Sequence, residues 1–520
     1  MPIPGQVGGK SVSLSHCCCT PFAASVNVSA PGYYKASRVS EPWLVLKFGG
    51  TSVSGRQQWE TIVALAKQRL EDGNRVLLVC SAVSGITNAL QALADDSEQN
   101  ADRAIASILD RHYRLAAELG IESGEVIESA GKDMAHFFGL IKSAREPLGR
   151  QSALASLLSV GEWLSTQLGA QFLGRELQVE WVDARRALRA TAETRGSARR
   201  SRLSARCDGG VDLSLVQDWL NKPPLLITQG FIAEHPDGGT ALLGRGGSDT
   251  SAALLASRLD ARHVEIWTDV PGLFSADPRI VAGARLLQSL NYEEALEMAA
   301  SGAKVVHSRC IRAAADAGIP VMIRDLARPE FAGTVIKKAA SSAANGYEGI
   351  RSVCLQPNMA VLLLQNLDTR EHVGFLAWVF AQISDAGVSV DLVATSETTT
   401  TVALNRVSNQ IDDAMLADLA DALRKRCAVK VYPRCSGINL VGRGARVALK
   451  QIDSEANFFA SHPLLMLSQS ANDLCISILL HSEDAEILLK VLHRTLIEDL
   501  PGLENNTHVF GPVWKDIQDR

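Results

Sequence analysis

The feature that most constrains the fold is an apolar run near the start of the chain that stops abruptly at a glycine-rich turn. Residues 43–46 (WLVL) read as a buried strand, and residues 47–52 (KFGGTS) end it. Paired glycines let backbone N–H groups approach an anion without a Cβ in the way, and Lys47 adds a positive charge. A strand, a Gly-Gly turn and a following helix form a natural phosphate seat. The alternative for this stretch alone is an ordinary strand-to-helix turn with a solvated lysine.

Two further loops repeat this combination of small and hydroxylated residues. The strand 75–80 (RVLLVC) leads into 81–88 (SAVSGITN), and 243–249 (LGRGGSD) opens a helix. Open α/β sheets bind their ligands at the carboxyl ends of the strands. Because the first and third loops each carry a cation, Lys47 and Arg245, the three loops together predict a large anionic ligand. A nucleoside triphosphate with an anionic second substrate is the simplest interpretation.

Length and composition exclude several other classes. At 520 residues the chain is too long for a single core. The net charge of -5 and the aromatic content of 5% argue against a nucleic-acid partner. No apolar run approaches the roughly 18 residues that span a membrane. The ten cysteines form no C-x-x-C pair, so neither a zinc site nor a redox pair is indicated, and free thiols in a reducing compartment are expected.

Sequence pattern divides the chain into five parts. Residues 1–41 form an extension whose first 40 residues lack acidic side chains and are rich in serine, which fits either an organellar transit peptide or a disordered segment. Alternating strands and helices fill 42–336, and the small residues of 337–347 predict a linker. Beyond the linker, 348–434 and 435–510 form a weak internal repeat in which each copy reads βαββαβ.

Seven short motifs, taken in order, resemble those of the aspartate kinases of the amino-acid kinase superfamily. The tandem modules resemble the ACT regulatory domains that follow the kinase in that family, and the arrangement is similar to the kinase half of bacterial fusions of aspartate kinase with diaminopimelate decarboxylase. The resemblance implies an open, mainly parallel α/β sheet with helices on both faces, followed by two ACT-like modules. The motifs are KFGGTS at 47–52, SAVSGITN at 81–88, GEWLS at 161–165, ITQGFI at 227–232, LGRGGSD at 243–249, WTDVPG at 267–272 and GAKVVH at 302–307.

The resemblance also implies an activity, which is the transfer of the γ-phosphoryl group of ATP to the side-chain carboxylate of L-aspartate. The product, 4-phospho-L-aspartate, opens the biosynthesis of lysine, threonine and methionine. Because the carboxylate is already ionised at pH 7, the reaction needs no general base and depends on positioning and charge neutralisation. Mg²⁺ would be bound mainly through the phosphates of ATP. The alternatives are a superfamily kinase for another amino acid and a catalytically weak amino-acid sensor.

The motif matches assign roles to individual residues. Lys47 would stabilise the transferring phosphoryl group and Asp249 would orient Lys47, so these two are the predicted catalytic residues. Arg245 would bind the α-carboxylate of the substrate and Glu162 its α-ammonium group. The alternative for Glu162 is a solvated carboxylate on the far face of its helix. The other predicted aspartate-binding residues are Thr87, Gly246, Gly247 and Ser248, and the predicted ATP-binding residues are Lys47, Gly49, Gly50, Ser52, Thr268, Asp269, Phe274, Arg279, Lys304 and Val305.

Two positions depart from the family pattern. Phe274 stands where relatives commonly carry tyrosine, so a hydroxyl contact to the nucleotide would be lost while stacking survives. Ser308 follows His307 where relatives usually carry proline, which would loosen a loop near the nucleotide. His307 itself is interpreted as a structural residue. Neither departure removes a charged group.

The ACT-like modules imply feedback inhibition by an amino acid. L-lysine is the expected effector, with threonine or a concerted effect as alternatives, and the physical alternative is an ordinary turn with a solvated Asp391. We expect a homodimer or higher homo-oligomer through these modules, no nucleic-acid or membrane partner, and a cytoplasmic enzyme, or a plastid or other organellar one if residues 1–40 are a transit peptide. The predicted effector residues are Gly374, Phe375, Leu376, Asp391, Thr395 and Ser396.

Overall fold

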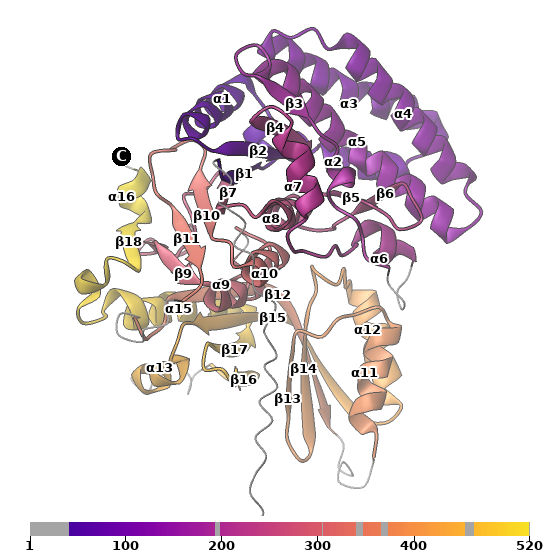
Figure 1. The fold of residues 1–520 in the computed structure, drawn as a ribbon. Coiled ribbons are helices and arrows are strands. Elements are labelled where there is room, and N and C mark those ends of the chain that lie inside the picture. The colour runs from indigo at the N-terminus through magenta and orange to yellow at the C-terminus, as the bar shows by residue number, and fades with distance from the viewer. Residues whose placement is uncertain are drawn as a thin grey trace, which may run out of the picture. The chain divides into compact units, whose positions relative to one another are not determined.

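The computed structural model describes residues 41–192, 198–303, 305–339, 347–365, 373–452 and 462–518. The predicted extension therefore lies outside the described residues, apart from Glu41. The described chain from Glu41 onward carries an eight-stranded and a six-stranded β-sheet, together with two sheets of two strands each (Figure 1). None of the helices in the described ranges combines the length and the apolarity needed to cross a membrane.

The larger sheet has eight strands in the order β3-β4-β2-β1-β7-β10-β11-β9. Its central strand β1 (Trp43–Phe48) pairs in parallel with both β2 (Arg75–Cys80) and β7 (His263–Thr268). Every residue of β1 and β2 is buried, which explains their nearly continuous apolar sequences, because a parallel sheet is covered on both faces. The mainly parallel α/β fold predicted from the sequence is confirmed. The other strands are β3 (Val179–Trp181), β4 (Leu225–Gln229), β9 (Ser289–Asn291), β10 (Val321–Asp325) and β11 (Thr334–Lys337).

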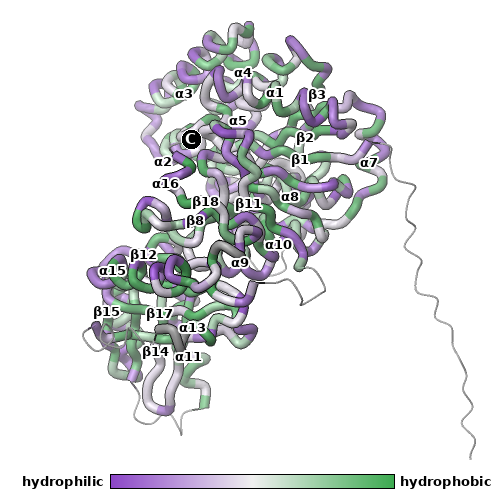
Figure 2. Tube along the Cα trace, turned by 90° about the vertical axis from the view of Figure 1, so that its left-hand side faces the viewer, coloured by the Kyte–Doolittle hydropathy of each residue, from purple (hydrophilic) through white to green (hydrophobic). Residues whose placement is uncertain are grey.

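Alternate residues of β1 enter two different cores, as the two-residue period of a strand requires. Val45 packs into a core that includes α8 (Gly247–Leu259), and Leu44 packs into one that includes α1 (Arg56–Glu71) and α5 (Pro147–Leu173). The apolar character of β1 and β2 stands out in Figure 2. The remaining helices around this sheet are α2 (Ile86–Asp95), α3 (Glu98–Leu119), α4 (Gly124–Ser143), α6 (Ala198–Leu203), α7 (Leu213–Leu220), α9 (Tyr292–Ala300) and α10 (Ser308–Ala317).

The smaller sheet has six strands in the order β13-β14-β12-β15-β17-β16. Two long strands, β12 (Ser352–Gln365) and β15 (Ala428–Val441), run through its centre and are antiparallel to each other. The other elements of this region are β13 (Leu392–Thr395), β14 (Thr399–Asn405), β16 (Met466–Gln469), β17 (Cys475–His481), α11 (Phe375–Asp385), α12 (Asp413–Arg424), α13 (Ala445–Ile452) and α15 (Ser482–His493).

The two long strands each extend through both of the modules predicted for this region. The second half of β12 pairs with β14 and with the first half of β15, whereas residues 352–356 pair only with the second half of β15. The register shifts at residues 356–361, between the two parts of β12. The predicted boundary at 434/435 thus falls inside one continuous strand, and residues 352–356, which the prediction places in the first module, pair with the second half of β15.

The end of the chain packs against residues that precede the predicted linker. Strand β18 (Phe510–Val513) pairs with β8 (Arg285–Leu287), and helix α16 (Trp514–Gln518) follows. The ring of Trp514 packs edge-on against Phe274 with a centroid distance of 5.4 Å. Nη1 of Arg328 donates a hydrogen bond to the carbonyl of Ile517 at 2.6 Å. Residues after 510, which no predicted module contains, therefore pack on the first domain.

Helices α1 and α5 approach each other closely at a glycine. Trp59 of α1 is fully buried, and its Nε1 donates a hydrogen bond to the carbonyl of Val53 at 3.1 Å, which fixes the indole. A Cβ built on Gly169 of α5 would lie 2.1 Å from an indole carbon. Only a glycine fits at this crossing without displacing the ring.

We expect Gly169→Ala to lower the free energy of unfolding by about 1–3 kcal/mol, because the fixed indole must move to admit a methyl group. The matched control is Gly139→Ala on α4, where a Cβ would meet no heavy atom within 4 Å. This control should gain roughly 0.5–1 kcal/mol, because alanine is less flexible than glycine in a helix. Chemical denaturation of the three proteins measures both changes. Equal stability of Gly169→Ala and the wild type would contradict the close packing.

Candidate functional site

A cavity of about 440 Å³ lies where the three glycine-rich loops meet. Its lining comes from residues 47–51, 81–88 and 244–249, with one residue from α5 and one that follows β4. The first two loops are adjacent because β1 and β2 are neighbouring parallel strands. The prediction that these loops meet at one edge of the sheet is therefore confirmed. The predicted site residues that line this cavity are Lys47, Gly49, Gly50, Thr87, Glu162, Gly246, Gly247, Ser248 and Asp249.

The first two loops are joined by backbone contacts around Gly50. The carbonyl of Gly50 accepts hydrogen bonds from the N–H of Ser84 at 3.2 Å and from Oγ of Ser54 at 2.5 Å. A Cβ on Gly50 would lie 2.8 Å from the carbonyl oxygen of Ala82, so a side chain here would push the loops apart. Ser52 lies in the short 3-10 helix η1 (Thr51–Val53), is 3% exposed and is not among the lining residues.

Lys47 and Asp249 form an ion pair inside the cavity. Nζ of Lys47 lies 2.5 Å from Oδ1 of Asp249, and the two side chains are 11% and 12% exposed. Asp249 sits in the first turn of α8, whose leading N–H groups have no partner within the helix. A fixed ammonium group beside the positive end of a helix dipole favours an anion at this point.

Glu162 is a buried carboxylate that faces the same cavity from α5. It is 3% exposed, so the alternative of a solvated side chain on the far face of its helix is wrong. Burial raises the pKa of the Glu162 carboxyl to about 8, and hydrogen bonds from its own N–H and from the N–H of Ala82 oppose this rise. Oε2 has no hydrogen-bond partner within the described chain. Since buried polar atoms are normally paired, this oxygen is suited to a ligand cation.

Helix α5 is tied to the second loop, and this fixes the place of Glu162. Oγ of Ser165 donates a hydrogen bond to the carbonyl of Ser81 at 2.8 Å. A Cβ on Gly161 would approach the Cβ of Ala82 to 3.0 Å, so the helix lies close against the loop. The position of the Glu162 carboxylate is therefore fixed by the contact between α5 and the second loop.

The third loop is held by close contacts that only glycine allows. Gly246 has a φ of +65°, and a Cβ there would lie 2.3 Å from Cβ of His307. Nδ1 of His307 accepts a hydrogen bond from the N–H of Arg309 at 3.2 Å, which caps α10, and burial lowers the pKa of His307. These contacts agree with the structural role expected for His307.

Phe231 is a lining residue that the sequence reasoning missed. It follows β4 with a φ of +71°, which is uncommon for a residue with a side chain, and its N–H donates to Oγ of Ser251 at 2.8 Å. A Cβ on Gly247 would lie 2.5 Å from the Phe231 ring, so the ring packs directly against the third loop. The only signal in the sequence was its place inside the ITQGFI motif.

The remaining predicted substrate and nucleotide residues lie outside the lining. Arg245 is exposed beside Gly246. Thr268 ends β7, the strand next to β1, and therefore lies along the same edge of the sheet, where its Oγ1 donates to Oδ1 of Asp269 at 3.1 Å. The predicted roles of these residues stay predictions.

The other predicted ATP-binding residues differ from one another in exposure and in their contacts. Phe274 is 8% exposed, packs against Trp514 and has its carbonyl bonded by Oγ of Ser352 at 3.2 Å. Arg279 is exposed and pairs with Asp277 at 2.6 Å, which raises the pKa of Arg279. Val305 is half-buried, and Lys304 lies outside the described residues.

The predicted effector residues lie at the start of α11 and along the segment that contains β13, the next element of the chain. Gly374 caps α11 with a φ of +91°, followed by the half-buried Phe375 and the exposed Leu376. Asp391 is exposed at its surface, and its Oδ2 accepts a hydrogen bond from the N–H of Asn405 at 2.7 Å; neighbouring atoms that partly desolvate the carboxyl raise its pKa. Thr395 ends β13 and is exposed, and Oγ of Ser396 lies 2.6 Å from Oγ1 of Thr399.

Comparison with known proteins places this arrangement in a family. The model of the amino acid kinase family matches residues 42–325. Lysine-sensitive aspartokinase 3 of Escherichia coli (strain K12) is 32% identical over 460 residues, which are 88% of this chain and 99% of the relative, and aspartokinase 2, chloroplastic, of Arabidopsis thaliana is 29% identical over 88% of this chain and 85% of the relative. The crystal structure of E. coli aspartokinase III in complex with aspartate and ADP has a TM-score of 0.71 at 29% identity, and the complex with lysine and aspartate has 0.69 at 28%, each with 87% of this chain and 99% of that chain covered. The chain therefore belongs to the amino acid kinase family and, within it, to the aspartokinases.

Proposed function

We propose that this chain transfers the γ-phosphoryl group of ATP to the side-chain carboxylate of L-aspartate and so produces 4-phospho-L-aspartate. The observation that carries the proposal is that one cavity contains both a fixed ammonium group, on Lys47, and a buried carboxylate, on Glu162, that has no cation partner among the described residues. Transfer of a phosphoryl group to a carboxylate requires a positive charge such as that of Lys47. Binding of a free amino acid requires a negative charge, such as that of Glu162, for its ammonium group. The E. coli aspartokinase III to which this chain is similar was crystallised with aspartate and ADP.

Lys47 supplies the charge that the reaction requires. Transfer of a phosphoryl group to an ionised carboxylate removes no proton, so stabilisation of the transferring oxygens is the main task. Asp249 holds the lysine ammonium in place at 2.5 Å, and the N–H groups of Gly49 and Gly50 donate to the same phosphate. A group fixed in advance does not have to reorganise when charge develops.

Glu162 and the start of α8 hold the amino acid. The α-ammonium group of aspartate pairs with the unpartnered oxygen of Glu162. The N–H groups at the start of α8 and the hydroxyls of Ser248 and Thr87 bind the carboxylates. Arg245, exposed beside this loop, completes the site by a bidentate contact to the α-carboxylate.

ATP enters along the edge of β7, with Mg²⁺ on its phosphates. The described residues contain no group of three His, Cys, Asp or Glu side chains that could hold a metal ion. The acidic residues suited to face it are Asp249 and Asp269. The ion supplies charge neutralisation at the phosphates. The base and ribose are assigned to Thr268, Phe274, Arg279, Lys304 and Val305.

One assay separates this proposal from its alternatives. ATP, Mg²⁺ and L-aspartate are supplied with hydroxylamine, which traps an acyl phosphate as a coloured hydroxamate. Hydroxamate with L-aspartate supports the proposal. Hydroxamate with L-glutamate alone would favour a superfamily kinase for another amino acid, and none with any amino acid would favour a sensor.

We expect Lys47→Ala to lower kcat by about 10²–10³ with a much smaller change in the aspartate KM, because the lost charge acts mainly on the transition state. The control is Lys67→Ala, which removes a lysine from the exposed face of α1, where it pairs with Glu176. Steady-state kinetics by the hydroxamate assay measures both variants. A near-wild-type kcat in Lys47→Ala would remove this residue from the mechanism.

Aspartate binding should release a proton from Glu162. With a pKa of about 8 the carboxyl is about nine-tenths protonated at pH 7, and an ammonium partner favours the ionised form and lowers this pKa. Affinity for aspartate should therefore rise from pH 6 to pH 8 and level off above. Calorimetry in two buffers of different ionisation enthalpy measures the proton released.

The variant Glu162→Gln serves as the test of this assignment. It should raise the aspartate KM roughly tenfold or more, because the buried ammonium loses its partner, and it should abolish the proton release. ATP binding should change little. If aspartate binding to the wild type releases no proton at pH 7, Glu162 does not meet the ammonium group.

We further propose that L-lysine inhibits the enzyme by binding between the start of α11 and β13, at an interface between two copies of the chain. The N–H groups after Gly374 suit an α-carboxylate, and the second oxygen of Asp391 suits an ammonium group. The similar E. coli enzyme is named lysine-sensitive and was crystallised with lysine and aspartate. Inhibition requires that lysine bind an inactive arrangement more tightly than the active one.

Thr395→Ile should weaken this inhibition while leaving uninhibited activity nearly intact, because a larger side chain crowds the end of β13 far in sequence from the catalytic loops. The measurement is a titration of wild type and variant with lysine, threonine and both together. Inhibition by threonine alone would reassign the effector. If neither amino acid inhibits the wild type at millimolar concentrations, the regulatory proposal is wrong even though the kinase assignment stands.

A further inference from the structure

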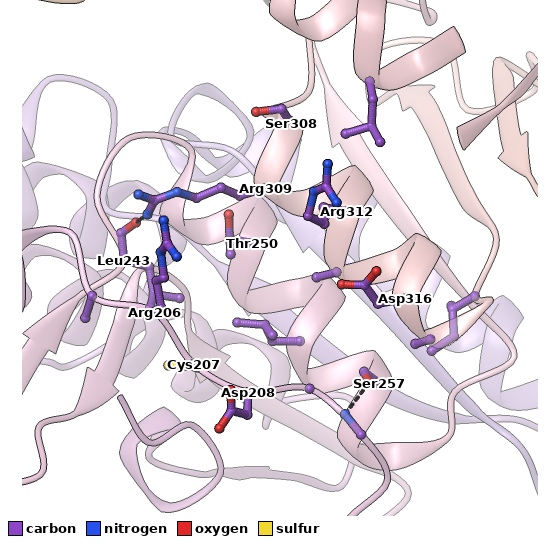
Figure 3. Close-up of a pocket in the computed structure, with 18 of the residues that line it drawn as sticks. Arg206, Cys207, Asp208, Leu243, Thr250, Ser257, Ser308, Arg309, Arg312 and Asp316 are labelled. Carbon is purple, nitrogen blue, oxygen red and sulfur yellow. Dashed lines mark hydrogen bonds between the residues drawn. The ribbon is translucent and has the colours of Figure 1, made fainter. Parts of the chain in front are cut away.

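A second cavity, of about 1060 Å³, opens on another part of α8 (Figure 3). Thr250, Leu254 and Ser257 line it from one face of the helix, whereas the catalytic cavity is lined by residues 247–249. Its other walls are the segment 205–211 and helices α9 and α10. The volume is that of a small-molecule site rather than of a packing defect. None of the roles assigned above uses this space.

Three arginine side chains line this second cavity. Figure 3 shows Arg206 and Arg309 on one side of Thr250 and Arg312 on the other. Arg309 is held in place, because it donates to the carbonyl of Leu243 at 2.8 Å and to Oγ of Ser204 at 3.0 Å. Within the described ranges, the guanidinium groups of Arg206 and Arg312 form neither an ion pair nor a hydrogen bond. The charges of Arg206 and Arg312, which have no ion-pair partner among the described residues, favour an anionic ligand, and arginine is the residue best suited to carboxylate and phosphate.

The rest of the lining limits the kind of anion. Leu254, Leu296 and Ile319 provide an apolar surface beside the arginines. Asp316 lies one turn further along α10 from Arg312, and Asp208 lies at the opposite end of the cavity in Figure 3. These carboxylates disfavour a ligand that carries a second anionic group. The lining thus fits one anionic head on a short apolar body.

We propose that this second cavity is a binding site for a small organic anion, a carboxylate or a phosphate monoester, whose head lies between Arg206, Arg309 and Arg312. Two of these arginines come from α10 and one from the segment 205–211. A bound anion therefore joins two elements that are separate in the sequence.

Hydrogen bonds from residues that line this cavity reach the third glycine-rich loop, residues 243–249. Oγ1 of Thr250 donates to the carbonyl of Gly246 at 3.0 Å, and Arg309 bonds the carbonyl of Leu243. His307, which caps α10, packs against Gly246. An anion that moves Arg309 or the start of α10 therefore acts on residues 243–249, which hold Arg245 and Ser248. Occupancy of the second cavity should change the aspartate KM.

Binding is tested with phenyl phosphate and phenylacetate, which carry the two candidate heads on the same apolar body. Calorimetric titrations use the full chain with ADP, Mg²⁺ and L-aspartate at saturation, so that the catalytic cavity is filled. At least one probe should bind, and the neutral analogue 2-phenylethanol should not. The probe that binds more tightly identifies the head. If neither probe binds the wild type, the proposal is wrong.

The double variant Arg206→Ala/Arg312→Ala identifies the site. Both side chains are exposed and outside the catalytic cavity, so the variant should fold, which its thermal unfolding checks. It should bind the probe at least about tenfold more weakly, since two charge-assisted contacts are lost. Arg103→Ala, which removes an exposed arginine on α3, and Lys47→Ala should both bind as the wild type does. Unchanged affinity in the double variant would overturn the assignment.

The effect of the second cavity on aspartate binding is measured in a separate experiment from probe binding and from kinase activity. Saturating probe should shift the aspartate KM of the wild type and leave that of the double variant unchanged. A shift of equal size in both proteins would place the effect in the catalytic cavity and contradict the coupling. The hydroxamate assay without any probe tests the kinase activity alone, so failure of one proposal is distinguishable from failure of the other.

Discussion

The ion pair between Lys47 and Asp249 is the contact on which the arrangement of the site depends. It joins the end of β1 to the first turn of α8, and so holds the first glycine-rich loop against the third. Because both side chains are nearly buried, their attraction is much stronger than it would be in water, and removing one partner would leave the other charge uncompensated. In the mechanism proposed above, the same pair fixes the cation that meets the phosphate. Stability of the loops and readiness for catalysis therefore rest on one interaction.

The two carboxylates of the cavity face different environments. Asp249 has an ammonium group at 2.5 Å, whereas among the described residues Glu162 meets backbone N–H donors and has one oxygen without a hydrogen-bond partner. Burial without a cation is what raises the pKa of Glu162 to about 8. A carboxyl in this state is stabilised most by a ligand that brings a positive charge. The site thus selects a cationic group at one end and an anionic group at the other, which is the charge pattern of a free amino acid beside a phosphate.

The sequence was sufficient to predict the sheet and the meeting of its loops, because apolar parallel strands and the small residues after them are local signals. The burial of Glu162 was not predictable from its helix, since α5 is buried on many sides and shows no polar face. The positive φ of Phe231 has no signature in a residue that has a side chain. The shared strands β12 and β15 were missed because strand register depends on contacts between distant segments, which a repeat pattern does not contain.

The glycines of the motifs carry a constraint beyond ligand binding. A Cβ on Gly230 would lie 2.6 Å from Cβ of Ser248, one on Gly246 would meet His307, and one on Gly50 would meet a carbonyl of the neighbouring loop. Each of these glycines therefore lets two elements of the site touch, whether or not a ligand is near. The loops must lie this close for a single cavity to contain a cation from β1 and a carboxylate from α5. Close packing between the loops, as much as binding of a phosphate, explains why these motif positions are occupied by small residues.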